Sequence, residues 1–147
     1  MTLHIPLVKL PLLLHLLTET PASISFLLFP QTQLPTADPN PAAALLILRN
    51  FGGLLLSTNL IALVFLLRPA FDSLSALVTL SLASYHVWPI YRAYSRLLLQ
   101  QQRPNLTKGK KQHDVNRNLV LGGPIVHFWV HICCLIGLVL SGWHGLG

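Results

Sequence analysis

The stretch AALLILRNFGGLLLSTNLIALVFLL (residues 43–67) decides the fold class of this chain. It holds 25 residues, and Arg49 is the one charged side chain among them. A helix that crosses a bilayer needs about 20 mainly apolar residues. The stretch therefore predicts a membrane-spanning helix. Residues 71–91 and 119–140 are further apolar runs, of 21 and 22 residues, and they predict two more.

The composition of the whole chain agrees with a membrane environment. Of its 147 residues, 52% are hydrophobic and 10% are charged, whereas about a quarter of the residues of soluble domains are charged. Four acidic and ten basic side chains cannot cover the apolar surface of a soluble protein of this size. Residues 1–147 are therefore predicted to form a single all-α domain, a small integral membrane helix bundle.

The N-terminal region leaves three interpretations open. Its leucines repeat at steps of four and three, on one helical stripe: Leu3, Leu7, Leu10, Leu14 and Leu17. Prolines and polar residues interrupt the region, so it is an imperfect span within residues 5–29, a helix that lies on the membrane surface, or a cleaved signal. The extreme N-terminus lacks basic residues, which argues against a signal. We favour a fourth span.

The connectors predict the orientation. Residues 30–41 hold four prolines and form an extended connector, whereas the basic loop, residues 92–118, holds seven of the ten Lys and Arg residues. Positive loops stay on the cytoplasmic side, so the basic loop is expected there, in contact with anionic lipid. It lacks interleaved aromatic residues, so nucleic acid is not an expected partner. The acceptor triplet that begins at Asn105 is then expected to carry no glycan.

Ionisable side chains within the apolar runs indicate where a site would lie. Arg49, His86 and His127 each lie about 8–12 Å inside the cytoplasmic end of a predicted helix, taking ~1.5 Å per residue. Such residues usually face the interior of a bundle. Arg49, Gly53 and Ser57 follow one another at four-residue spacing, which predicts a face of the second helix that another helix approaches closely. His131 shares a helix face with His127.

These positions give a candidate catalytic set, namely Arg49, His86, His127 and His131. Neutral histidines act as acid and base, and an arginine stabilises a developing oxyanion or holds an acidic group. Three of them, His86, His127 and His131, form an alternative metal set. The segment HFWVH (127–131) lacks the glutamate of zinc hydrolases, and no carboxylate is expected at similar depth. No cofactor or metal is therefore predicted.

Three classes of function fit these features. The first is a small tailoring enzyme that acts on a lipophilic metabolite, and the second is a non-catalytic membrane subunit or assembly factor whose buried polar groups specify helix pairing. A transporter is third, because so small a bundle would have to oligomerise to enclose a path. The expected partners are the lipid bilayer, a lipophilic small molecule, and a second copy or another membrane protein.

Three segments carry a resemblance to a known group of proteins: ALLILRNFGGLLLSTN (44–59), SYHVWPIYRAYSRL (84–97) and GGPIVHFWVH (122–131). They resemble small multi-pass membrane proteins of filamentous fungi, some of which are encoded beside enzymes of secondary metabolism. The resemblance covers residues 43–135 and is general in character. It implies a role in metabolite tailoring and a location in the endoplasmic reticulum, and it carries no assignment of catalytic residues.

Overall fold

The structure, a computed structural model, describes residues 5–34, 40–101 and 123–147. This part of the chain is helical and contains no strand. Its elements are η1 (Leu7–Lys9), α1 (Leu10–Leu28), η2 (Pro30–Gln33), α2 (Pro41–Leu67), α3 (Ser73–Tyr85), α4 (Val87–Gln101) and α5 (Gly123–His144). The segments Leu7–Leu28, Pro41–Leu67 and Gly123–His144 are long and apolar enough to cross a membrane. The predicted all-α membrane bundle is confirmed.

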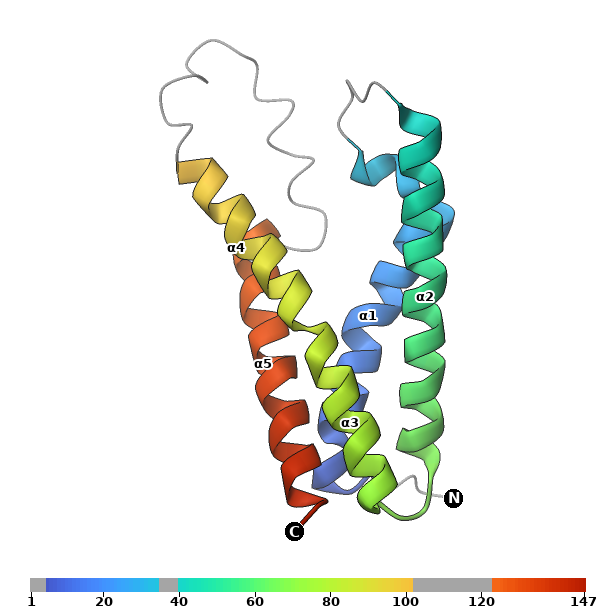
Figure 1. Cartoon of the computed structure of the whole chain (residues 1–147), viewed down its shortest axis with the longest axis vertical. Coiled ribbons are helices and arrows are strands. Elements are labelled where there is room, and N and C mark those ends of the chain that lie inside the picture. The colour runs from blue at the N-terminus through green and yellow to red at the C-terminus, as the bar shows by residue number, and fades with distance from the viewer. Residues whose placement is uncertain (1–4, 35–39, 102–122) are drawn as a thin grey trace.

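The helices run roughly side by side along one long axis (Figure 1). α1 and α2 pack as an antiparallel pair, and α5 packs against both α3 and α4. The described N-terminal residues, the α2–α3 turn and the end of α5 lie at one end of the bundle (Figure 1). The end of α1, the start of α2 and the end of α4 lie toward the other. Most of the basic loop, including Asn105, lies outside the described residues.

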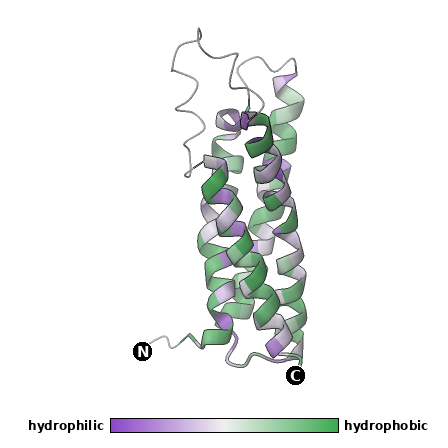
Figure 2. Cartoon of the chain, turned by 90° about the vertical axis from the view of Figure 1, so that its left-hand side faces the viewer, coloured by the Kyte–Doolittle hydropathy of each residue, from purple (hydrophilic) through white to green (hydrophobic). Residues whose placement is uncertain are grey.

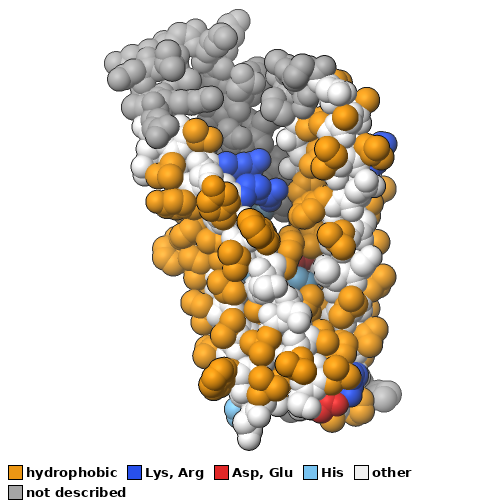
Figure 3. Space-filling view, in the orientation of Figure 1, with side chains coloured by type: hydrophobic (Ala, Val, Ile, Leu, Met, Phe, Trp, Pro, Cys, Tyr) orange, Lys and Arg blue, Asp and Glu red, His pale blue; other side chains and the backbone are white. Residues whose placement is uncertain are grey.

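α1 turns its polar residues inward, whereas the leucine stripe noted in the sequence faces outward. Its buried residues recur every three or four positions: Leu12, His15, Glu19, Ser23 and Phe26. In contrast, Leu7 and Leu17 are 83% and 66% exposed. The outer surface of the bundle is mostly apolar, as Figures 2 and 3 show. Lipid accepts exposed leucines at no cost, so this outward-facing stripe suits a helix in a membrane.

α2 packs through a different face from the one predicted. Its buried residues are Gly52, Leu55, Asn59, Ala62 and Leu66. Arg49 and Ser57 are exposed, and nothing lies within 4 Å of a Cβ built at Gly53. A Cβ at Gly52 would instead lie 2.9 Å from Cβ of Phe26. The predicted Arg49–Gly53–Ser57 interface is therefore wrong, because the close approach to α1 occurs one residue earlier, about 100° around the helix.

Residues 71–91, predicted to form one membrane-spanning helix, instead belong to two shorter helices, α3 and α4, which meet at His86 and are not among the three segments long and apolar enough to cross a membrane. Pro89 has no N–H for the carbonyl of Tyr85, so the hydrogen-bond ladder is interrupted here. α4 then continues through residues 92–101, so the helix extends into the first part of the basic loop. Ser75, Thr79 and His86 of this run are all buried.

Asp72 begins α3. Its Oδ1 accepts hydrogen bonds from the backbone N–H of Ser75 at 2.9 Å and from the Ser75 hydroxyl at 2.7 Å, and its Oδ2 lies 2.6 Å from Nη2 of Arg68. The Ser75 hydrogen bonds, with a smaller contribution from Arg68, hold the pKa of this carboxyl below its usual range. The turn between α2 and α3 is thus fixed by a helix cap and an ion pair.

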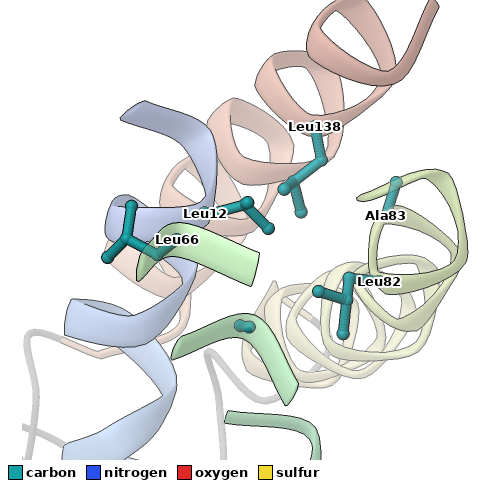
Figure 4. Packing of buried hydrophobic residues seen from close by; sticks show 6 residues of the cluster. Leu12, Leu66, Leu82, Ala83 and Leu138 are labelled. Carbon is teal, nitrogen blue, oxygen red and sulfur yellow. The ribbon is translucent and has the colours of Figure 1, made fainter. Parts of the chain in front are cut away.

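An apolar core fills the end of the bundle that holds the described termini. Leu12, Leu66, Leu82, Ala83 and Leu138 pack against one another from α1, α2, α3 and α5 (Figure 4). Lys9 is buried beside this core, and its Nζ donates to the carbonyls of Leu66 and Arg68 at the end of α2. A lysine at a helix C-terminus satisfies carbonyls that have no partner within the helix.

Candidate functional site

A cluster of polar side chains lies next to the apolar core, one helical turn further along α1 and α3. We call it the interior cluster, and it consists of His15 and Glu19 on α1, Tyr85 and His86 at the α3–α4 break, and His131 on α5. The Pro89 break ends α3 here, and Tyr85 and His86 at that point both contact α1 residues of the cluster. The cluster therefore joins three segments that are far apart in the sequence.

Three imidazoles of the interior cluster form a chain. Nδ1 of His15 lies 3.0 Å from Nε2 of His86, and Nδ1 of His86 lies 2.9 Å from Nδ1 of His131. A hydrogen bond between two imidazoles needs a proton on one ring and a lone pair on the other. Since His86 uses both of its nitrogens, it donates from one and accepts at the other when neutral. This arrangement can pass a proton along the chain.

Glu19 contacts the same chain through its carboxylate. Its Oε2 accepts a hydrogen bond from the hydroxyl of Tyr85 at 3.1 Å. Its Oε1 lies 3.3 Å from Nδ1 of His131 and 3.8 Å from Nδ1 of His86, yet it accepts no hydrogen bond from a described residue. Nε2 of His15 likewise has no hydrogen-bond partner in the described part of the chain.

The interior cluster is almost fully closed to its surroundings. The side chains of His86 and Glu19 are 0% and 2% exposed, and His15 is fully buried. Burial of a carboxylate within a membrane bundle carries a large free-energy cost unless it is paired. Such groups usually serve a function, so the cluster is the strongest candidate site in the described residues.

A small pocket opens beside the interior cluster, on the side of α4 and α5. It is lined by Pro89, Arg92, Ala93, Arg96, Pro124, His127 and His131. Its volume is about 10 Å³, room for about one water molecule. Lys and Arg side chains gather in the hollow between the two halves of the molecule, with His and acidic atoms visible below them (Figure 3). His131 is the one residue shared by the pocket and the cluster.

The structure separates the four candidates predicted from the sequence. His86 and His131 are in contact within the interior cluster. His127 lies one turn away, with its ring stacked on that of His131 at a centroid distance of 5.9 Å. Arg49 is exposed on α2 and has no ion pair or side-chain hydrogen bond with any described residue. The expectation that Arg49 joins the histidines is therefore wrong.

Sequence reasoning missed His15, Glu19 and Tyr85. The expectation that no carboxylate lies at the depth of the histidines is wrong, since Oε1 of Glu19 lies 3.3 Å from His131. A usable signal was present, because His15 and Glu19 are one turn apart and continue a stripe with Leu12 and Ser23. In a membrane helix, such a polar stripe marks the face toward the bundle.

The structure groups a different set of possible metal ligands from the one suggested by the sequence. His15, Glu19 and His86 each offer a ligand atom, and these atoms lie within 4.8 Å of one another. The earlier set of His86, His127 and His131 is not a compact group of this kind among the described residues.

Comparisons with family models, with curated proteins and with solved structures find no match to this chain.

Proposed function

We propose that this membrane protein is a small enzyme that moves protons on a lipophilic substrate, with His131 as the acid–base residue. One observation carries the proposal: His131 lines the pocket while the Glu19 carboxylate and the His86 ring contact it from the interior. A carboxylate behind a histidine fixes the orientation of the ring and stabilises its protonated form. Cofactor-free isomerisation or cyclisation suits such a residue.

The pocket entrance suggests the class of substrate. Arg92 and Arg96 line it together with His127, and arginines bind carboxylates through paired hydrogen bonds. A substrate with an apolar body and an acidic group would place that group between the arginines. Because the pocket holds about one water molecule, substrate entry requires α4 and α5 to separate slightly. The resemblance noted in the sequence would place this activity in the endoplasmic reticulum, on a secondary metabolite.

A non-catalytic subunit is the second candidate. Polar contacts between helices favour it: the Ser23 hydroxyl donates to the carbonyl of Gly52 at 3.0 Å, and the Asn59 amide donates to the Thr20 hydroxyl at 3.3 Å. Such contacts specify helix pairing in membranes. They lie along the α1–α2 interface, away from His131, so they explain the pairing of these two helices but not the buried Glu19–His131 contact.

The test compares two variants with the same amino-acid exchange on the same helix, in the source organism. A strain without the gene is complemented with the wild-type chain, with His131→Asn or with His144→Asn, and lipophilic extracts are analysed by untargeted mass spectrometry. We expect a metabolite that the wild type restores and that falls by about 100-fold or more with His131→Asn. His144→Asn makes the same exchange on the same helix, at an exposed residue outside the pocket, and should restore the metabolite fully.

Protein abundance in the membrane fraction is measured for every variant. Full restoration by a His131→Asn chain that accumulates like the wild type would overturn the proposal. So would a deletion that changes no metabolite but removes another membrane protein from the fraction, which would favour the subunit. If His131→Asn fails to accumulate, Glu19→Gln serves instead, because it retains an acceptor for Tyr85, and the same loss is expected.

A further inference from the structure

We propose that His15, Glu19 and His86 form a binding site for a divalent transition-metal ion of the zinc or ferrous class. The site lies in the interior cluster, behind His131 as seen from the pocket. This inference goes beyond the proposed function, because acid–base chemistry at His131 requires no metal.

The spacing of the ligand atoms supports the site. Nδ1 of His15 and Nε2 of His86 are 3.0 Å apart. Two nitrogens bound to one tetrahedral ion at ~2.0–2.1 Å are about 3.3 Å apart, so an ion in place of the shared proton needs only a small movement of the rings. Glu19 completes the group, since one carboxylate oxygen and one nitrogen of each histidine lie within 4.8 Å of one another.

A carboxylate oxygen of Glu19 that lacks a hydrogen bond points to a missing ligand. Oε1 of Glu19 accepts no hydrogen bond from the described residues. It is also buried, since Glu19 is only 1% exposed. A buried polar atom without a partner carries a substantial cost. An ion bound between this oxygen and the two imidazoles removes that cost. It also balances the negative charge of the carboxylate, which forms no ion pair with a lysine or arginine among the described residues.

The neighbouring contacts suit a metal site as well. Metal-bound histidines usually hydrogen-bond a second group through the other ring nitrogen, which fixes the ring orientation. If Nε2 of His86 binds the ion, its Nδ1 remains bonded to His131 at 2.9 Å. Tyr85 in turn holds Oε2 of Glu19 at 3.1 Å and leaves Oε1 for the ion. Two ligands thus have an outer partner already in place.

The ligand types indicate the class of ion. Two imidazoles and one carboxylate bind zinc in hydrolases that keep a fourth position open, and the same set binds ferrous iron in non-haem oxygenases. Calcium and magnesium prefer oxygen ligands alone. The shared chemistry is therefore that of a divalent transition metal, and titration with each ion separates the two.

The test uses the purified full-length chain in mild detergent. The protein is treated with a chelator, titrated with Zn²⁺ or, without oxygen, with Fe²⁺, and separated from free metal; bound metal is then measured by plasma mass spectrometry. One ion per chain is expected. A competing chromophoric chelator should report a Kd that rises by about 100-fold or more for His15→Asn and for Glu19→Gln.

His127→Asn is the matched control, since this histidine lies close by but outside the ligand set. Its Kd should equal that of the wild type. The proposal is overturned if neither ion binds, or if His127→Asn weakens binding as much as His15→Asn does. The readout is independent of activity: a chain that binds no metal but loses its metabolite with His131→Asn refutes the metal site alone, and the reverse outcome refutes the proposed function alone.

Discussion

Replacing His86 with alanine is expected to lower the free energy of unfolding by about 2–4 kcal/mol. The side chain is 0% exposed and bonds to both His15 and His131. Its removal leaves a cavity at the α3–α4 break and two buried imidazoles without their partner. Both effects are destabilising, because the cavity loses packing contacts and the two rings lose hydrogen bonds that nothing nearby replaces.

Unfolding by sodium dodecyl sulfate in mixed micelles, followed by tryptophan fluorescence, measures this difference. His127→Ala is the control, because its ring is half-buried, lines the pocket and makes no hydrogen bond with a described residue. It should cost less than about 1 kcal/mol. Equal losses for the two variants would mean that His86 does not occupy the buried position between α1 and α5.

Gly52→Val is expected to destabilise the α1–α2 pair by about 1–3 kcal/mol. A Cβ at this position lies 2.9 Å from Cβ of Phe26 and 3.1 Å from the backbone nitrogen of Leu27. Backbone cannot rotate away, so α1 must move outward. The Ser23 hydroxyl, which donates to the carbonyl of Gly52 at 3.0 Å, would lose its partner in that movement.

Gly53→Val is a closely matched control, because the same exchange occurs one residue later. Nothing lies within 4 Å of a Cβ there, and the change in helix propensity is similar. The same detergent titration should therefore show near-wild-type stability for Gly53→Val. If Gly53→Val were the more damaging variant, α2 would have to be rotated toward the face that the sequence suggested.

The membrane class could be predicted because it depends on sums over many residues. Residues 43–67 correspond to α2, which begins two residues earlier, and residues 119–140 overlap α5. Three helices meet the requirement of length and hydropathy, including the N-terminal one. Such averages tolerate local interruptions such as Lys9 and Glu19. The break at His86 was missed because hydropathy does not register the backbone effect of Pro89.

The interior cluster could be predicted only in part, because helix rotation is set by packing. In water an apolar stripe marks the buried face, but in lipid apolar residues suit both faces. The leucines of α1 therefore gave no direction, and its inward face is marked by His15 and Glu19 instead. On α2, adjacent residues Gly52 and Gly53 face different surroundings, and only the contact with Phe26 distinguishes them. Without that contact, the sequence does not distinguish an Arg49 that faces the bundle from one that faces outward.

The rotation of α1 against α5 is the central claim, since it brings His15 and Glu19 to His131. The contact between Thr18 and Cys134 depends on this rotation, since Oγ1 of Thr18 lies 3.9 Å from Sγ of Cys134. Cys134 is buried and its neighbour Cys133 is exposed, and both are free. A cysteine at position 18 should therefore reach one of these two thiols and not the other.

Oxidative cross-linking of Thr18→Cys in native membranes, read by mass spectrometry of digested protein, makes the measurement. With copper–phenanthroline, Thr18→Cys in a Cys133→Ala background should form a disulfide to Cys134, and Leu17→Cys, at a 66% exposed position, should not. Linkage of Thr18→Cys to Cys133 in a Cys134→Ala background would contradict this rotation, as would efficient linkage from Leu17→Cys alone. In either case Glu19 would not face His131.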